Sequence, residues 1–209
     1  CAPVLDVPVA GAHDIIGDRA FSDDPTVVGT LGGLVAETFL AHGIHPVVKH
    51  IPGHGRSTAD SHEALPVVSA GRDALEATDF SPFRMVRDAP FGMTAHIVYT
   101  AFDAEHPATT SPYVVEEIIR KAIGFDGLLM TDDLSMKALK GPFEDRARLS
   151  LDAGCDLVLH CNGDMAEMTA VIAGCRRLDD AGQRRWKAAL ARRATQPEPF
   201  DIGAAENEL

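Results

Sequence analysis

The sequence predicts an α/β fold with parallel strands and, within that class, a TIM-type (β/α)₈ barrel. Short apolar runs alternate with helical patterns, an order typical of a parallel sheet with helical crossovers. The runs also end in polar residues such as Asp6, Lys49 and His96. Parallel strands place their carboxyl ends at one rim, where barrels of this type hold their active site. The alternative is an open doubly wound sheet, which often carries a G-x-G-x-x-G loop; Gly53-x-Gly55 does not match that spacing.

Five apolar runs are predicted to be the strands. They cover residues 2–5, 46–48, 91–95, 127–130 and 156–159. Their continuous apolar character suits strands that are buried on both faces of a parallel sheet. No low-complexity linker separates them, so we expect them to belong to one sheet.

Two longer helices are predicted from their caps. One begins at Asp24-Pro25 and stops at Gly43, and the other begins at Ser111-Pro112 and stops at Gly124. One face of the first is marked by Val27, Leu31, Leu34, Val35 and Phe39, and the buried side of the second is predicted to contain Val114, Val115, Ile118, Ile119 and Ala122.

Further helices complete the alternation. One begins at Ser81-Pro82, one follows Pro142 and ends at Gly154, and one is capped by Asp164. Basic residues recur at helical spacing in 184–193. We interpret them as the solvated face of a helix and assign them no binding role.

Composition limits the classes of partner. The chain has 209 residues, 45% of them apolar, which suits a single domain. A net charge of -12 disfavours binding to nucleic acid and acidic membranes. The four cysteines lack zinc-site spacing, and there is no candidate membrane span. We expect a cytoplasmic protein with its catalytic domain in residues 1–195 and an acidic tail in 196–209.

One segment holds more titratable side chains than a simple connection needs. Lys49-His50-Ile51-Pro52-Gly53-His54-Gly55, followed by Asp60-Ser61-His62, comes directly after an apolar run. Its proline and glycines exclude a continuous helix or strand. Loops held by a rigid strand are where catalytic groups usually lie.

This segment and two others together resemble glycoside hydrolase family 3, in particular its bacterial β-N-acetylhexosaminidases of the cell-wall recycling type. The others are Thr131-Asp132-Asp133-Leu134-Ser135-Met136 and Ile16-Gly17-Asp18-Arg19-Ala20-Phe21. The resemblance covers about residues 1–162. It implies a TIM-type barrel that removes terminal N-acetylglucosamine from peptidoglycan-derived muropeptides, with no cofactor and no metal.

The sequence also departs from that family. Its members carry three further barrel strands before the one that ends in Asp6, including a D-Q-E-G-G segment that has no counterpart here. We therefore expect about the last five strands of the barrel, in the carboxyl-terminal part of a single catalytic domain. The first and last of these strands would then have unpaired edges.

The resemblance assigns the catalytic roles. Asp132 matches the nucleophile of a retaining glycosidase, which forms a covalent glycosyl-enzyme. His62, oriented by Asp60, matches the acid that protonates the leaving oxygen. Asp133 should point away from Asp132, because side chains alternate along a strand.

The resemblance also assigns the substrate-binding roles. Arg19, Lys49 and His50 match positions that bind the sugar hydroxyls and the acetamido group, for which charged donors are well suited. His54 is expected to brace the glycine-rich turn, and Asp6 and His96 are expected to support the site from behind.

Two other function classes stay open at this point. A metal-dependent barrel hydrolase could use His50, His54 and His62 with Asp60 and Asp132, although the usual His-x-His pair is missing. The chain could instead be an inactive fragment or an interaction module. Phosphate in place of water as the attacking group is a minor variant of the glycosidase mechanism, and the sequence does not define the oligomeric state.

Overall fold

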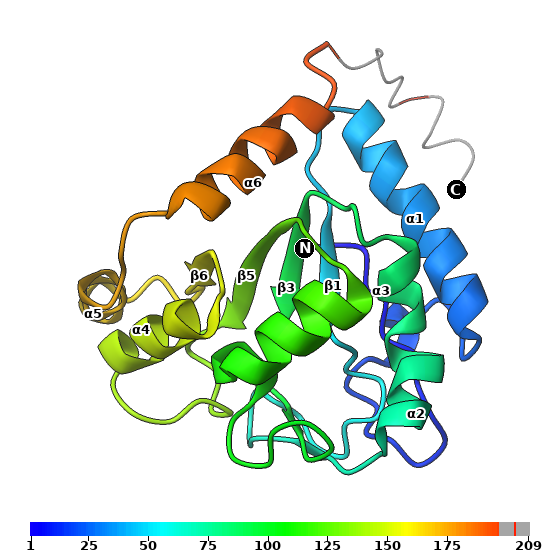
Figure 1. Ribbon diagram of the computed structural model, residues 1–209, viewed down its shortest axis with the longest axis horizontal. Helices are drawn as coiled ribbons and strands as arrows, with labels where there is room; N and C mark the ends of the chain where they lie inside the picture. Colours follow the sequence, from blue (N-terminus) through cyan, green and yellow to red (C-terminus); the bar gives the residue numbers. More distant parts are fainter. Residues whose placement is uncertain (197–202, 204–209) are drawn as a thin grey trace.

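A parallel four-stranded sheet forms the centre of the computed structural model, which describes residues 1–196 and 203 (Figure 1). Its strand order is β1 (Val47–Ile51), β3 (Phe91–Thr94), β5 (Leu128–Asp133) and β6 (Leu157–Leu159). Val4 adds a fifth position at one edge through a parallel bridge to Lys49. All five predicted strands are therefore present, side by side in chain order. The predicted α/β fold with five parallel, barrel-type strands is confirmed.

Helices connect the strands, as expected for a barrel. The two longest are α1 (Pro25–Ala41) before β1 and α6 (Asp180–Arg192) after β6. The shorter helices are η1 (Gly17–Arg19), α2 (Arg72–Ala74), η2 (Leu75–Asp79), α3 (Ser81–Met85), η3 (Ala108–Thr110), η4 (Val114–Ile123), α4 (Phe143–Ala153) and α5 (Met165–Ala173). A second, two-stranded parallel sheet, absent from our sequence prediction, pairs β2 (Val67–Val68) with β4 (Val98–Tyr99).

The main core lies between the sheet and the helices α3 and η4. Ile51 and Leu129 on the strands share one buried cluster with Phe83 of α3 and Ile118 of η4. Helix η4 ends as predicted, because Gly124 adopts φ 81° there, a left-handed conformation that glycine tolerates without strain. Its predicted buried side is confirmed for Val114, Val115, Ile118 and Ile119, while Ala122 is half-buried.

Helix α1 is buried on a different face from the one that the apolar pattern marks. Val28, Gly29, Gly32, Ala36 and Leu40 are buried, whereas Val27, Leu31 and Leu34 are exposed and Val35 and Phe39 are half-buried. The reason is close packing: a Cβ on Gly32 would lie 2.0 Å from Leu5, and one on Gly29 would lie 2.4 Å from Met85. The helix packs against Leu5 and against α3 through its small residues. A pattern of large apolar residues does not reveal this buried face.

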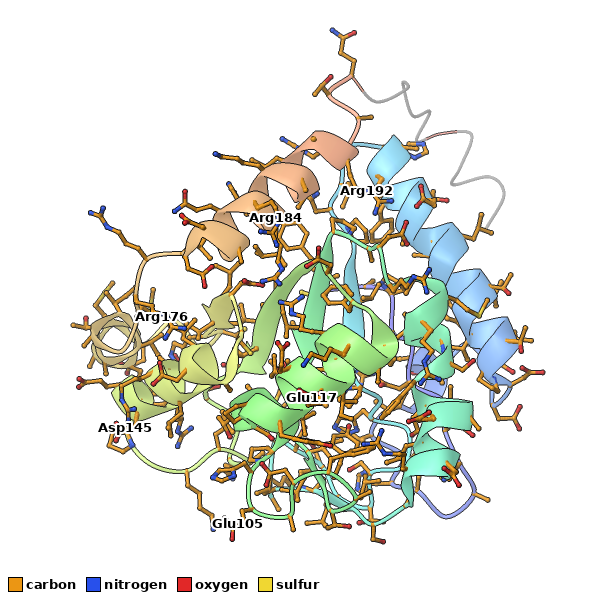
Figure 2. The ribbon with its side chains drawn as sticks, viewed as in Figure 1. Glu105, Glu117, Asp145, Arg176, Arg184 and Arg192 are labelled. Carbon is orange, nitrogen blue, oxygen red and sulfur yellow. The ribbon has the colours of Figure 1, made fainter. Side chains whose placement is uncertain are left out.

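Helix α6 crosses the amino-terminal end of the sheet (Figure 1). Its Ala189 packs with Phe91 and Leu128, which begin β3 and β5. Arg185 pairs with Asp126 and Asp156 in the segments before β5 and β6. Arg192, labelled in Figure 2, likewise pairs with Glu37 of α1. Two arginines of the basic cluster therefore form ion pairs with other parts of the fold, and the cluster is not simply a solvated face.

The carboxyl ends of the strands point toward the loops at the bottom of Figure 1, the end of the sheet opposite α6. The candidate site is predicted from the sequence to lie at this rim. Among the described residues, no helix has the length and apolar content that a membrane crossing requires. The predicted acidic tail, residues 196–209, lies almost entirely outside the described residues.

Candidate active site

Asp132 lies at the carboxyl end of β5 and is only 9% exposed. Its Oδ2 is 3.8 Å from Nε2 of His50, and its Oδ1 accepts a hydrogen bond from the Asp133 backbone at 2.8 Å. Asp133 has different partners, since its carboxylate accepts hydrogen bonds from Ser135 and from the backbone of Cys161. The two neighbouring carboxylates therefore lie in different surroundings, as the alternation of side chains along a strand predicts.

His50 connects Asp132 to a fully buried carboxylate. Its Nδ1 is 2.7 Å from Oδ2 of Asp6 on the adjacent edge segment. An ionised carboxylate can only accept hydrogen bonds, so Nδ1 carries a proton, and Nε2 is the ring nitrogen that faces Asp132. His50 thus presents Nε2 to the space beside Asp132, where it can form a hydrogen bond with a hydroxyl group.

Asp6 also holds the loop that follows β1. Its Oδ1 accepts hydrogen bonds from the backbone N–H groups of His50 at 3.2 Å and His54 at 2.6 Å. Burial acts to raise the pKa of Asp6, but His50 and His54 outweigh burial, and the pKa is lowered from its ordinary value of 3.8. Asp6 is therefore an ionised anchor of the site, in the supporting position that the sequence indicated.

Replacing Asp6 by alanine is expected to lower the free energy of unfolding at pH 7 by about 3–5 kcal/mol, because it leaves buried donors without an acceptor. The lowered pKa means that this contribution is fully present above the unfolded-state pKa, near 3.8, and is lost as the pH falls through the folded-state value. Urea unfolding from pH 7 to pH 3 should therefore show a constant deficit that shrinks only below about pH 4. Substitution of the exposed Asp23 is the control, and an equal effect there would contradict the anchor role.

Lys49 and Arg19 lie in the same region as Asp132. Burial lowers the pKa of the Lys49 ammonium, Asp132 opposes this shift, and Arg19 adds to it. Arg19 donates hydrogen bonds to the carbonyls of Ile15 at 2.6 Å and Ile16 at 3.3 Å. Within the described residues it forms no ion pair with a neighbouring aspartate. The Lys49 ammonium therefore interacts electrostatically with both Asp132 and Arg19, and it can donate hydrogen bonds to polar groups of a ligand beside Asp132.

His62 and Asp60 form a pair on the β1–β2 loop, residues 52–66. Nδ1 of His62 is 2.8 Å from Oδ1 of Asp60, which also accepts the His62 backbone N–H at 2.8 Å. Burial acts to raise the pKa of Asp60, but the hydrogen bonds from His62 together outweigh it, and the pKa is lowered from its ordinary value. The carboxylate fixes the Nδ1 proton of the ring, and Nε2 is free to exchange a proton with a ligand. The His62 side chain is 60% exposed.

The β1–β2 loop packs against the segment that follows Asp132. The Ser61 carbonyl accepts a hydrogen bond from Ala138 at 3.2 Å, and Ser61 Oγ lies 3.8 Å from the sulfur of Met136. Both loops belong to the same rim of the sheet. Among the described residues, no hydrogen bond or ion pair joins His62 to Asp132.

Two further histidines, His96 and His54, contact Asp133 and His50. His96 is buried, with Nδ1 2.7 Å from Thr109 Oγ1 and Nε2 3.1 Å from the Asp133 carbonyl. His54 packs edge-on against His50 at 5.4 Å between ring centroids, and its Nε2 is 3.4 Å from Ser61 Oγ. Their positions match the supporting roles expected from the sequence.

Comparison with known proteins agrees with this arrangement. Residues 1–192 match the family described as "Glycosyl hydrolase family 3 N terminal domain". The chain belongs to glycoside hydrolase family 3. The resemblance found in the sequence motifs is thereby confirmed.

Several relatives within family 3 carry informative names. A "Beta-hexosaminidase" of Alkalilimnicola ehrlichii is 44% identical over 86% of this chain and 51% of its own length. The crystal structure of NagZ from Neisseria gonorrhoeae in complex with N-trifluoroacetyl-D-glucosamine matches with TM-score 0.83 and 31% identity, over 99% of this chain and 61% of that one. A family 3 β-N-acetylglucosaminidase from Paenibacillus sp. gives TM-score 0.82 and 32% identity, over 97% of this chain and 42% of that one. The chain spans about half the length of the curated relatives it matches.

The predicted site residues of this family 3 chain fall into two groups. Asp132, His50 and Lys49 lie on β5 and β1 of the sheet, with Arg19 of η1 linked to them through its charge interaction with Lys49. His62 and Asp60 lie on the β1–β2 loop. Sequence reasoning missed the contacts that fix this loop, which come from Tyr99 and from the Arg56–Asp79 pair. Their spacing in the sequence does not reveal these contacts, because Tyr99 lies on β4 of the second sheet and Asp79 lies on η2.

Proposed function

We propose that this chain carries the catalytic residues of a retaining β-N-acetylglucosaminidase that removes terminal N-acetylglucosamine from peptidoglycan-derived muropeptides. The observation that carries the proposal is the placement of Asp132 beside Lys49 and His50, next to a loop that holds a hydrogen-bonded Asp60–His62 pair. The site thus contains one buried carboxylate, that of Asp132, and one possible proton donor, the His62 imidazole that is hydrogen-bonded to Asp60. The names of the relatives support the class of sugar.

The reaction then has two steps. The Asp132 carboxylate attacks the anomeric carbon and forms a glycosyl ester, while His62 Nε2 donates its proton to the leaving oxygen as the glycosidic bond breaks. Next, the neutral His62 takes a proton from water, the water oxygen bonds to the anomeric carbon, and the ester bond to Asp132 breaks. Asp60 keeps the His62 ring in the correct tautomer and stabilises its protonated form.

The sugar would be held by the groups around Asp132. Lys49 and Arg19 can donate charged hydrogen bonds to the hydroxyls and to the acetamido carbonyl, and His50 can form one with a hydroxyl. These interactions orient the anomeric carbon toward Asp132. The exposed His62 would then meet the glycosidic oxygen when the β1–β2 loop closes over the substrate.

The stereochemistry of the product tests the covalent mechanism. A chromogenic β-N-acetylglucosaminide should release the β-anomer of N-acetylglucosamine first, which proton NMR can detect before mutarotation. Appearance of the α-anomer first would rule out the glycosyl-enzyme. Added phosphate tests the minor variant, because phosphorolysis would yield a sugar 1-phosphate.

Chelation separates the glycosidase from a metal-dependent hydrolase. Within the described residues, no group of three His, Cys, Asp or Glu side chains is arranged to hold a metal ion. We therefore expect turnover of the chromogenic substrate to stay within about twofold of its initial value after exhaustive chelation, since no step above needs a Lewis acid. A loss of activity that added zinc restores would favour the metal hypothesis.

The domain assignment is part of the proposal. Residues 1–195 would form the carboxyl-terminal part of one catalytic barrel domain in a cytoplasmic enzyme, and the open edge of β6 would then pair with further strands. Turnover should be compared between the 209-residue chain and the same chain joined to the amino-terminal half of the Alkalilimnicola ehrlichii relative. No turnover in either form would favour the reading as an inactive or interacting module.

A further inference from the structure

Arg56 and Asp79 form an ion pair that the reaction above does not use. Arg56 follows the glycine-rich turn of the β1–β2 loop, and its Nε lies 2.6 Å from Oδ2 of Asp79 at the end of η2. The Asp79 side chain is only 1% exposed, against 20% for Arg56. The pair therefore links the loop that carries His62 to a buried part of the helix layer.

The same region of the loop is held at two other points. Tyr99 donates a hydrogen bond to the Gly53 carbonyl at 2.6 Å. Gly53 has φ 136° and lies against Asp79, so that a Cβ there would be 2.9 Å from the Asp79 Cβ. Beyond Ser57 the loop is more open, and His62 and Glu63 are exposed. Arg56 is thus the charged side chain that ties the part of the loop before Asp60 to the helix layer.

Burial makes the ionised form of Asp79 unfavourable in the folded state, and the pairing with Arg56 offsets only part of this effect. Burial raises the pKa of Asp79 to about 6, and the opposing effect of Arg56 does not cancel this. Asp79 Oδ1 is also buried without a hydrogen-bond partner among the described residues. Ionised Asp79 is therefore unfavourable in the folded state at neutral pH, and the unfolding free energy falls as the pH rises from about 4 to about 6. An ionised carboxylate that burial disfavours, at the base of the loop that carries His62, points to a functional reason.

We propose that Arg56 and Asp79 are positioning residues, whose ion pair holds the β1–β2 loop in the arrangement that delivers His62 to the leaving oxygen. This inference rests on the proposed glycosidase function. The pair would hold the base of the loop in place, so that His62 reaches the leaving oxygen when the loop closes, and it would not touch the sugar. Its loss should therefore impair proton donation while leaving the sugar-binding groups around Asp132 in place.

Replacing Arg56 by glutamine tests the inference. We expect kcat/KM for substrates with poor, alkyl-type leaving groups to fall by about 10- to 100-fold, because a small displacement of an acid group is costly. Activated aryl substrates, which depart without protonation, should change by less than about threefold. R56K, which keeps the charge, should recover part of the loss. The matched control is R72Q, which removes an exposed ion pair with Glu76 in the neighbouring helical segment.

Hydrogen exchange provides a readout that is independent of turnover. In R56Q, the backbone amides of residues 57–64 should exchange faster, while those of β3 and β5 keep their protection. D79N mimics the protonated carboxyl and should retain the fold, because the ionised group is unfavourable there. At pH 7.5 its loop should therefore exchange faster than the parent loop, as in R56Q. Arg56, Asp6 and Tyr99 are the titratable groups that face Asp79.

The outcomes separate the two claims. If the parent chain, in either length described above, hydrolyses no N-acetylglucosaminide, the proposed function fails. If the parent turns over but R56Q impairs both substrate classes equally, or leaves exchange in residues 57–64 unchanged, the positioning role is wrong. Selective loss with poor leaving groups, together with faster loop exchange, supports it.

Discussion

Replacing Asp132 by alanine is expected to reduce kcat/KM by about 10³-fold or more, which corresponds to at least about 4 kcal/mol of transition-state stabilisation. The reason is chemical: without the carboxylate no glycosyl ester can form, and the two-step route is lost. Folding should be little affected, because within the part of the chain that the structure describes the only hydrogen bond that the Asp132 side chain accepts comes from the backbone of Asp133. Urea unfolding should place the change within about 1 kcal/mol.

The neighbouring carboxylate is the matched control for this experiment. Asp133 accepts hydrogen bonds from Ser135 and Cys161, so its substitution by alanine should cost about 1–3 kcal/mol of stability through unpaired donors. It should have a smaller effect on the kcat/KM of the folded enzyme. Azide added to the Asp132→Ala variant should attack the anomeric carbon from the vacated side and give an α-glycosyl azide. Substantial residual hydrolysis without azide would move the nucleophile to another residue.

The strands and most helix ends were predictable because local signals determine them. Proline and aspartate at the start of α1, and Gly124 and Gly154 at the ends of η4 and α4, act through the backbone of their own turn. The Asp60–His62 pair was predictable for the same reason, since two residues on one short turn can meet without help from the fold. Asp132 at a strand end follows from the parallel order of the sheet.

The features that sequence reasoning missed all depend on contacts between distant segments. The buried face of α1 is decided by how closely Gly29 and Gly32 approach Met85 and Leu5, which no apolar count reveals. Arg56 and Asp79 are 23 residues apart and lie on different elements. Nothing in their own surroundings in the sequence distinguishes them from surface charges. The contacts that hold the β1–β2 loop could therefore not be predicted from the sequence, although the titratable residues of the loop could be recognised there.

Replacing His62 by alanine is the second experiment with a large expected effect. A general acid contributes about 10²- to 10⁴-fold when the leaving group needs a proton. We expect a loss of this size in kcat/KM for muropeptide-like substrates with alkyl leaving groups. Dinitrophenyl glycosides, whose leaving group departs as a stable anion, should lose less than about tenfold. The side chain is 60% exposed, so stability should hardly change.

A series of aryl N-acetylglucosaminides measures this dependence directly. In the alanine variant, log kcat/KM should fall much more steeply with the pKa of the leaving phenol than in the parent, because negative charge on the departing oxygen is no longer neutralised. His42→Ala is the control, since His42 is an exposed histidine at the end of α1, at the opposite end of the sheet. Asp60→Asn should give an intermediate slope, because the ring keeps a hydrogen-bond partner but loses the charge that stabilises its protonated form. Parallel lines for the parent and the His62 variant would remove His62 from the acid role, and the proton donor would then have to come from another group at the same rim.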